Sequence, residues 1–76
     1  MKIGAQGLVE VPESELRALL GHVYRGTLPC PLDVAGLARV GLQHRAEVIL
    51  HHLRRLDAIA VRSVLVAVIA ERAARS

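Results

Sequence analysis

Four histidines are the residues whose spacing most directly tests for metal chemistry in this 76-residue chain. His44, His51 and His52 fall within one expected helix, and His22 falls within another. Two histidines that share a zinc ion on one helix usually stand at i and i+4. His44 and His51 are two turns apart instead, roughly 10 Å along the axis, so they cannot share an ion, although His22 could join one of them. We expect no metal site and interpret the histidines as surface residues.

The nucleophiles and carboxylates give no clearer sign of catalysis. Cys30 is the only cysteine and stands between two prolines. A reactive thiol needs a base and surroundings that stabilise the thiolate, whereas the nearest helix start is capped by the acidic Asp33. Each of the seven carboxylates has a ready role as a helix-end or surface charge. No nucleophile elbow, P-loop or dinucleotide fingerprint occurs. We expect a protein that is not an enzyme and that needs no cofactor.

Composition limits the way in which this chain can build a core. It has no Phe or Trp, and Tyr24 is its only aromatic residue. The core must therefore consist of Leu, Val, Ile and Ala, which suits closely packed helices better than a small sheet. A single domain of this size buries only about 60% of its unfolded surface. Without a disulfide or a zinc framework, a second chain is the remaining common source of burial.

The N-terminal segment and the longest apolar run of the sequence indicate where the protein is located. The segment 1–10 has no long apolar core and no cleavage site, so it does not have the pattern of a signal peptide. We expect it to form an extended arm or one edge strand. The longest strictly apolar run, Val64 to Ala70, is far shorter than the roughly 20 residues of a membrane span. The sequence therefore predicts a soluble, cytoplasmic protein with no membrane partner and no small-molecule substrate.

Two helices are predicted in the first half of the chain. The first spans about 12–25, with Pro12 at its start and Gly26 as a left-handed C-cap. The second is short, about 33–40, with Asp33 as its N-cap and Gly41 as its end. The residues expected to face the core follow helical spacing: Leu16, Leu19, Leu20 and Val23 in the first helix, and Val34, Leu37 and Ala38 in the second.

Two longer helices are predicted in the second half, where all of the excess positive charge lies. The third spans about 43–56 and is amphipathic and basic. Its apolar stripe consists of Leu42, Ala46, Ile49, Leu50, Leu53 and Leu56. The fourth spans about 58–74, because Asp57 can cap it, its many alanines favour helix, and Glu71 and Arg75 stand at i and i+4.

The segment LARVGLQHRAEVILHHLRRLDA resembles a helix-turn-helix, with a short helix, a turn at Gly41 and a longer basic helix. It departs from the family pattern at Leu37, where a small residue is usual. The positions that the family keeps apolar are Glu47, His51 and Arg54 here, and the stripe lies two residues later, at Ile49, Leu53 and Leu56. The resemblance implies DNA contacts by Gln43, His44, Arg45 and Val48, with Arg55 near phosphates. A net charge of +3 is modest for that task.

The fold class that follows is all-α: a four-helix bundle with a short second helix, an N-terminal arm and an apolar C-terminal helix at its centre. A helix that is apolar on nearly every side must be surrounded. If the other three helices leave part of it bare, a second chain would cover it. We therefore predict a non-enzymatic adaptor or protein-interaction module, as a homodimer or with another protein; the alternative is a helix-turn-helix-like regulator. The predicted interface consists of Val61, Leu65, Val66 and Ile69, with Arg45, His52 and Arg55 as a charged rim.

Overall fold

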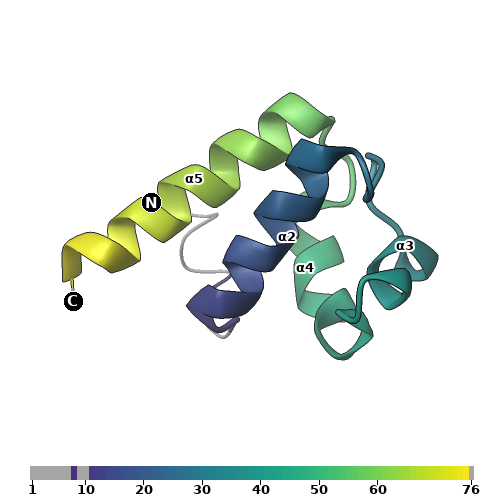
Figure 1. Ribbon diagram of the computed structural model, residues 1–76, viewed down its shortest axis with the longest axis horizontal. Helices are drawn as coiled ribbons and strands as arrows, with labels where there is room; N and C mark the ends of the chain where they lie inside the picture. The colour runs from purple at the N-terminus through teal and green to yellow at the C-terminus, as the bar shows by residue number, and fades with distance from the viewer. Residues whose placement is uncertain (1–7, 9–10, 76) are drawn as a thin grey trace.

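Helices make up most of the part of the chain that this computed structural model describes, which is residues 8 and 11–75 (Figure 1). In chain order they are α2 (Glu13–Arg25), α3 (Val34–Arg39), the 3-10 turn η1 (Gln43–Arg45), α4 (Ala46–Leu53) and α5 (Ala58–Arg75). No strand occurs among these residues, which confirms the all-α prediction. The expected arm 1–10 lies outside the described residues, except for Leu8. No helix of the described part has both the length and the apolar character needed to cross a bilayer.

Helix α2 begins and ends where the sequence predicts. Glu13 and Glu15 occupy its first turn, where the helix dipole favours negative charge. Gly26 follows its last residue with a φ of 77°, a conformation that glycine adopts without steric cost. Its buried face consists of Leu16, Leu19 and Val23. Leu20, which we expected on that face, is only half-buried.

Helix α3 is capped as predicted, because the Asp33 carboxylate accepts a 2.7 Å hydrogen bond from the Gly36 amide. It packs through Leu37 and Gly36, and a Cβ on Gly36 would lie only 3.0 Å from the Leu28 side chain. Val34 stands about 200° around the helix from Gly36, on the outer side. Val34 is accordingly 59% exposed, and Ala38 is exposed as well, so the prediction that these two residues face the core is wrong.

Helix α4 is shorter than the predicted helix 43–56. The first three residues of the predicted range form the 3-10 turn η1, and the α-helix itself ends at Leu53. The chain then turns through 54–56, with a hydrogen bond from the Leu56 amide to the Leu53 carbonyl. The apolar stripe is confirmed, since Leu42, Ala46, Ile49, Leu50 and Leu53 are buried and Leu56 packs half-buried against them.

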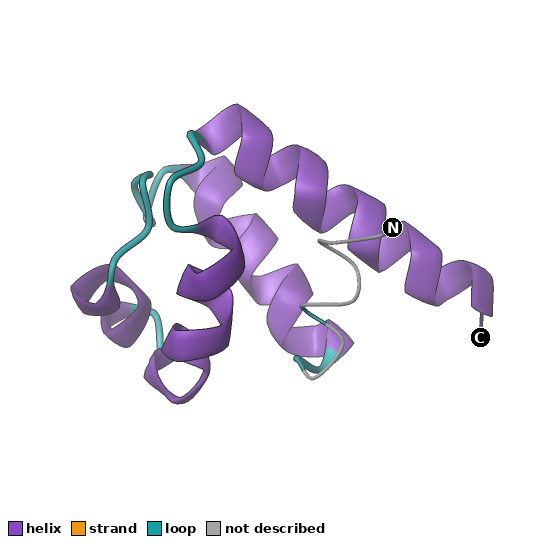
Figure 2. Cartoon of the chain, turned by 180° about the vertical axis from the view of Figure 1, so that it is seen from behind, coloured by secondary structure: helices purple, strands orange, loops and turns teal. Residues whose placement is uncertain are grey.

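Helix α5 starts at the predicted cap, where the Asp57 carboxylate accepts a 2.8 Å hydrogen bond from the Ala60 amide. It packs along α2 and runs in the opposite direction (Figure 1). The shorter elements α3, η1 and α4 lie on the other side of α2 (Figure 2). Helix α5 therefore lies at one edge of the fold, with one side turned away from the core. The prediction that this helix is central is wrong.

The last turn of α5 also binds the segment that precedes α2. The Arg72 guanidinium donates hydrogen bonds to the backbone carbonyls of Val11 and Leu8. Both residues bury their side chains almost completely in the core. Arg72 therefore fixes the chain at the point where it enters α2.

Candidate functional site

The four apolar residues that we predicted as an interface all lie on α5, but they differ in exposure. Val66 is 46% exposed, but Val61 and Leu65 are fully buried and Ile69 is 8% exposed. Those three side chains pack within the chain's own core. Of the four predicted residues, Val66 therefore has the large exposed surface, and Ile69 reaches the surface only at the lining of a hollow.

Two hollows lie on this side of the molecule, between α5 and α2. One of about 530 Å³ lies beside Ile59 and Arg62, and one of about 410 Å³ lies beside Ala70 and Ala73. Tyr24 and Val66 line both, so the hollows form one continuous surface, which we call the α2–α5 strip. Its members are Arg17, Leu20, Gly21 and Tyr24 from α2, and Ile59, Arg62, Ser63, Val66, Ala67, Ile69, Ala70 and Ala73 from α5.

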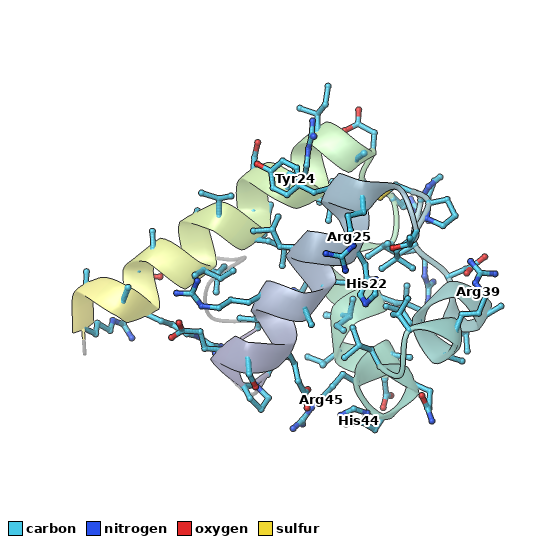
Figure 3. The ribbon with its side chains drawn as sticks, viewed as in Figure 1. His22, Tyr24, Arg25, Arg39, His44 and Arg45 are labelled. Carbon is cyan, nitrogen blue, oxygen red and sulfur yellow. The ribbon has the colours of Figure 1, made fainter. Side chains whose placement is uncertain are left out.

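The exposed centre of the α2–α5 strip is an aromatic ring. Tyr24 is 61% exposed and Ile59 is 67% exposed, although both carry a large apolar surface. Tyr24 lies near the end of α2, beside α5 (Figure 3). The Arg62 guanidinium carbon lies 5.1 Å from the centroid of the Tyr24 ring, within the range of a cation–π interaction. This contact links α2 to α5 and restrains the ring. The sequence analysis did not select Tyr24 or Ile59, because which side of α5 stays uncovered depends on how the helices pack.

A second cluster joins the first turn of α2 to η1. Glu15 accepts a 2.8 Å hydrogen bond from Arg45 Nε, and its other oxygen lies 3.0 Å from His44 Nε2 (Figure 3). The hydrogen bond with His44, followed by that from Arg45, lowers the pKa of Glu15 below its usual value near 4.5. Two of the residues that the helix-turn-helix resemblance assigns to DNA are thus paired with a carboxylate of their own chain.

Glu15→Gln should lower the free energy of unfolding at neutral pH and make that free energy change less as the pH falls. The folded-state pKa of Glu15 is lowered, so the carboxylate contributes stability above its ordinary pKa near 4.5. That contribution is lost as the pH falls through the lowered folded-state pKa. Urea unfolding between pH 7 and pH 3 measures it. Glu13→Gln is the control, because the partner of Glu13 among the described residues is Arg17 of the same helix, and this substitution should cost less stability at pH 7. Equal losses in the two variants at pH 7 would contradict this expectation.

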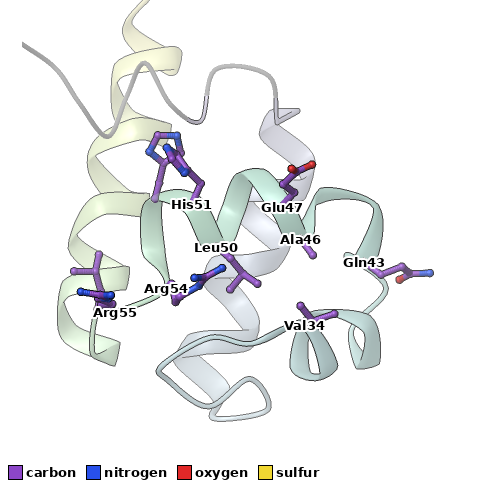
Figure 4. A pocket seen from close by; sticks show the side chains of 10 residues that line it. Val34, Gln43, Ala46, Glu47, Leu50, His51, Arg54 and Arg55 are labelled. Atoms are coloured by element: carbon purple, nitrogen blue, oxygen red, sulfur yellow. The ribbon is translucent and has the colours of Figure 1, made fainter.

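An open cleft of about 750 Å³ lies between α3 and α4 (Figure 4). It carries the basic side chains His51, His52, Arg54 and Arg55, together with the acidic Glu47. The two histidine rings meet edge to face, 4.7 Å apart. The basic residues cluster at the C-terminus of α4, where the helix dipole favours positive charge, so their position has a structural reason.

The predicted charged rim is not adjacent to the exposed apolar residues. His52 and Arg55 line the α3–α4 cleft, and Arg45 is paired with Glu15. None of these three lines either hollow of the α2–α5 strip. The structure therefore separates the two parts of the interface that we predicted as one.

The remaining candidates for chemistry have surroundings that favour structural roles. Burial, with a smaller effect of the Asp57 carboxylate, raises the pKa of the Cys30 thiol and so reduces its thiolate fraction at neutral pH. His22 Nδ1 lies 2.9 Å from the Thr27 hydroxyl, beside the C-terminus of α2. Within residues 8 and 11–75, no three His, Cys, Asp or Glu side chains are placed to hold a metal ion.

Within residues 8 and 11–75, the fold is that of a small all-α protein in which part of the surface between α2 and α5 is apolar and exposed. Its composition is 53% hydrophobic, yet the face between α2 and α5 remains exposed. No protein-family model, no curated protein and no solved structure matches the sequence or the fold.

Proposed function

We propose that this chain is a small non-enzymatic helical module that acts by docking another protein chain against the α2–α5 strip. The observation that carries the proposal is the gathering of exposed apolar side chains. Four large hydrophobic residues are exposed in the described part, and Tyr24, Ile59 and Val66 all lie on this strip. Single exposed apolar residues are normal on a soluble protein. A contiguous exposed patch is typical of an interaction site.

The chemistry of the α2–α5 strip suits a helix as the bound element. One of its hollows is lined by the small residues Ala70 and Ala73, which allow a helix backbone to approach closely. The larger Tyr24 and Val66 stand between the two hollows. Helix-in-groove recognition uses apolar anchors at i, i+3, i+4 and i+7 that fill such hollows. Tyrosine is among the residues most often found at the energetic centre of interfaces.

A helix-turn-helix-like DNA-binding regulator is the alternative, and the geometry supports it less. The elements α3, η1 and α4 do provide two helices joined by a glycine turn. Gln43 and Arg55 are exposed, as DNA contacts would be. However, His44 and Arg45 pair with Glu15, and Val48 packs against the core. Most of the residues that would approach the groove are therefore engaged within the chain.

A photo-cross-linking comparison tests the proposed docking module. A photoreactive amino acid placed at Val66 should give discrete adducts in the cells that produce the protein, with a second copy or with another protein. The same group at Val34 is the matched control, because Val34 is similarly exposed but lies on α3, outside the α2–α5 strip. Strong adducts from Val66 and weak ones from Val34 would support the module. Equal or absent adducts from both positions would rule it out.

A further inference from the structure

The exposed side of α5 carries a regular heptad pattern. Ile59, Ser63, Val66, Ala70 and Ala73 follow one another at spacings of four, three, four and three residues. This is the spacing of the a and d positions by which two helices pair along their length. The buried face of the same helix, Val61, Leu65, Val68 and Ile69, packs against its own chain. Helix α5 is therefore a helix with two contact faces, of which one has no cover within the described residues.

We propose that a second copy of this chain covers the α2–α5 strip, with the two α5 helices antiparallel about a two-fold axis. The proposal rests on the docking function above and names its partner. An axis that passes between Val64 and Leu65 makes Ile59 face Ala70 of the second copy. In the same register Ser63 faces Val66 of the second copy. Each layer then joins one larger side chain to one smaller one, and symmetry repeats each layer on the other side of the axis.

The distribution of side-chain size along the α2–α5 strip favours this arrangement over a parallel one. The protruding Ile59 lies at one end, beside the first hollow, and the small residues Gly21, Ala70 and Ala73 surround the other hollow. A parallel pair would set Ile59 against Ile59 and Ala70 against Ala70, leaving a bulge and a gap. An antiparallel pair inserts Ile59 of each copy into the hollow of the other. A two-fold contact of one patch with itself is also the commonest form of homo-oligomer interface.

The charges of the α2–α5 strip are compatible with a second copy. In the proposed register Arg62 faces Ala67 of the second copy, so the two Arg62 side chains do not meet. Arg62 is already held against Tyr24 of its own chain. The α2–α5 strip contains no carboxylate that would need a partner in the contact. Two strips can therefore meet without placing like charges in direct opposition.

The size of the contact sets the expected affinity. In this register the helices overlap over residues 58–71, which is about 21 Å at 1.5 Å per residue. One helix pair of that length, flanked by Leu20 and Tyr24, gives an interface at the low end of the range for specific complexes. We therefore expect a dissociation constant of tens of micromolar, with monomer and dimer in exchange.

Sedimentation velocity between about 5 and 500 µM tests the proposal through a charge-swap rescue. Wild type should shift from monomer to dimer over this range. Ile59→Lys and Ala70→Glu should each weaken dimerisation by at least about tenfold, because each buries an unpaired charge in both symmetric layers. The variant that combines Ile59→Lys with Ala70→Glu should recover most of the affinity, since the introduced charges then face each other between copies. Within one chain the two positions are about 16 Å apart along α5, too far to pair.

Ala18→Glu is the control, because Ala18 is an exposed alanine of α2 that lines neither hollow. It should dimerise like wild type. A monomeric wild type at 500 µM, single variants that dimerise normally, or a combined variant without rescue would each overturn the antiparallel pairing. If the purified protein is monomeric while Val66 cross-links to a different protein, the second copy is excluded and the docking module stands. If the protein is monomeric and Val66 gives no specific adduct, both the antiparallel dimer and the docking module are excluded.

Discussion

Leu65→Ala is expected to lower the free energy of unfolding by about 3 kcal/mol, because it leaves a cavity where α5 packs against the core. Leu65 is fully buried on the inner face of the helix that forms the main contact with α2. A domain of this size has a total stability of only about 4–11 kcal/mol. The loss should therefore lower the thermal midpoint by about 10–20 °C and leave part of the population unfolded near body temperature.

Val66→Ala is the matched comparison, at the next position of the same helix. Val66 is 46% exposed, so its truncation should change the stability of the monomer by no more than about 0.5 kcal/mol. Urea unfolding at low micromolar concentration measures both variants without a contribution from self-association. Equal losses from the two variants would mean that α5 is buried on both sides. The proposed division of this helix into a core face and an exposed face would then be wrong.

Local signals in the sequence were sufficient to predict the helix boundaries that depend on caps. Asp33 and Asp57 accept the predicted hydrogen bonds from backbone amides, and Gly26 and Gly41 have the positive φ of helix-terminating glycines. The end of α4 was missed because no glycine, proline or asparagine marks it. The apolar period continues through Leu56, although the α-helix ends at Leu53. Tertiary packing, rather than local preference, determines that boundary.

The candidate site was predicted only in part because exposure on α5 depends on which helices surround it. The sequence shows apolar residues on nearly every side between Val64 and Ala70 but does not show which side faces α2. Val61, Leu65 and Ile69 were as plausible for an interface as Val66, and packing against α2 and the core buried those three. Contacts such as Arg45 with Glu15 join residues 30 positions apart. No spacing rule within a helix indicates a contact of that kind.

Arg72→Met should destabilise the protein by about 1.5–3 kcal/mol, which is the range expected for hydrogen bonds to a charged group. The substitution keeps a long aliphatic side chain but removes the guanidinium that donates to the carbonyls of Leu8 and Val11. Those carbonyls belong to residues whose side chains are 0% and 1% exposed. Without Arg72, the Val11 carbonyl loses the guanidinium that donates to it, and the Leu8 carbonyl keeps the hydrogen bond from the Val11 amide.

Arg75→Met separates this anchoring effect from the general loss of a positive charge near the end of α5. Arg75 pairs at 3.3 Å with Glu71 in the same helix, and its side chain is 70% exposed. Such surface pairs contribute about 0.3–0.5 kcal/mol, so this variant should be close to wild type. Urea unfolding gives the two losses, and limited proteolysis should cut Arg72→Met faster ahead of α2. If both variants lose the same small amount, Leu8 and Val11 are held by apolar packing alone. A large loss in Arg72→Met alone would instead show that one side chain near the end of α5 holds the segment that precedes α2.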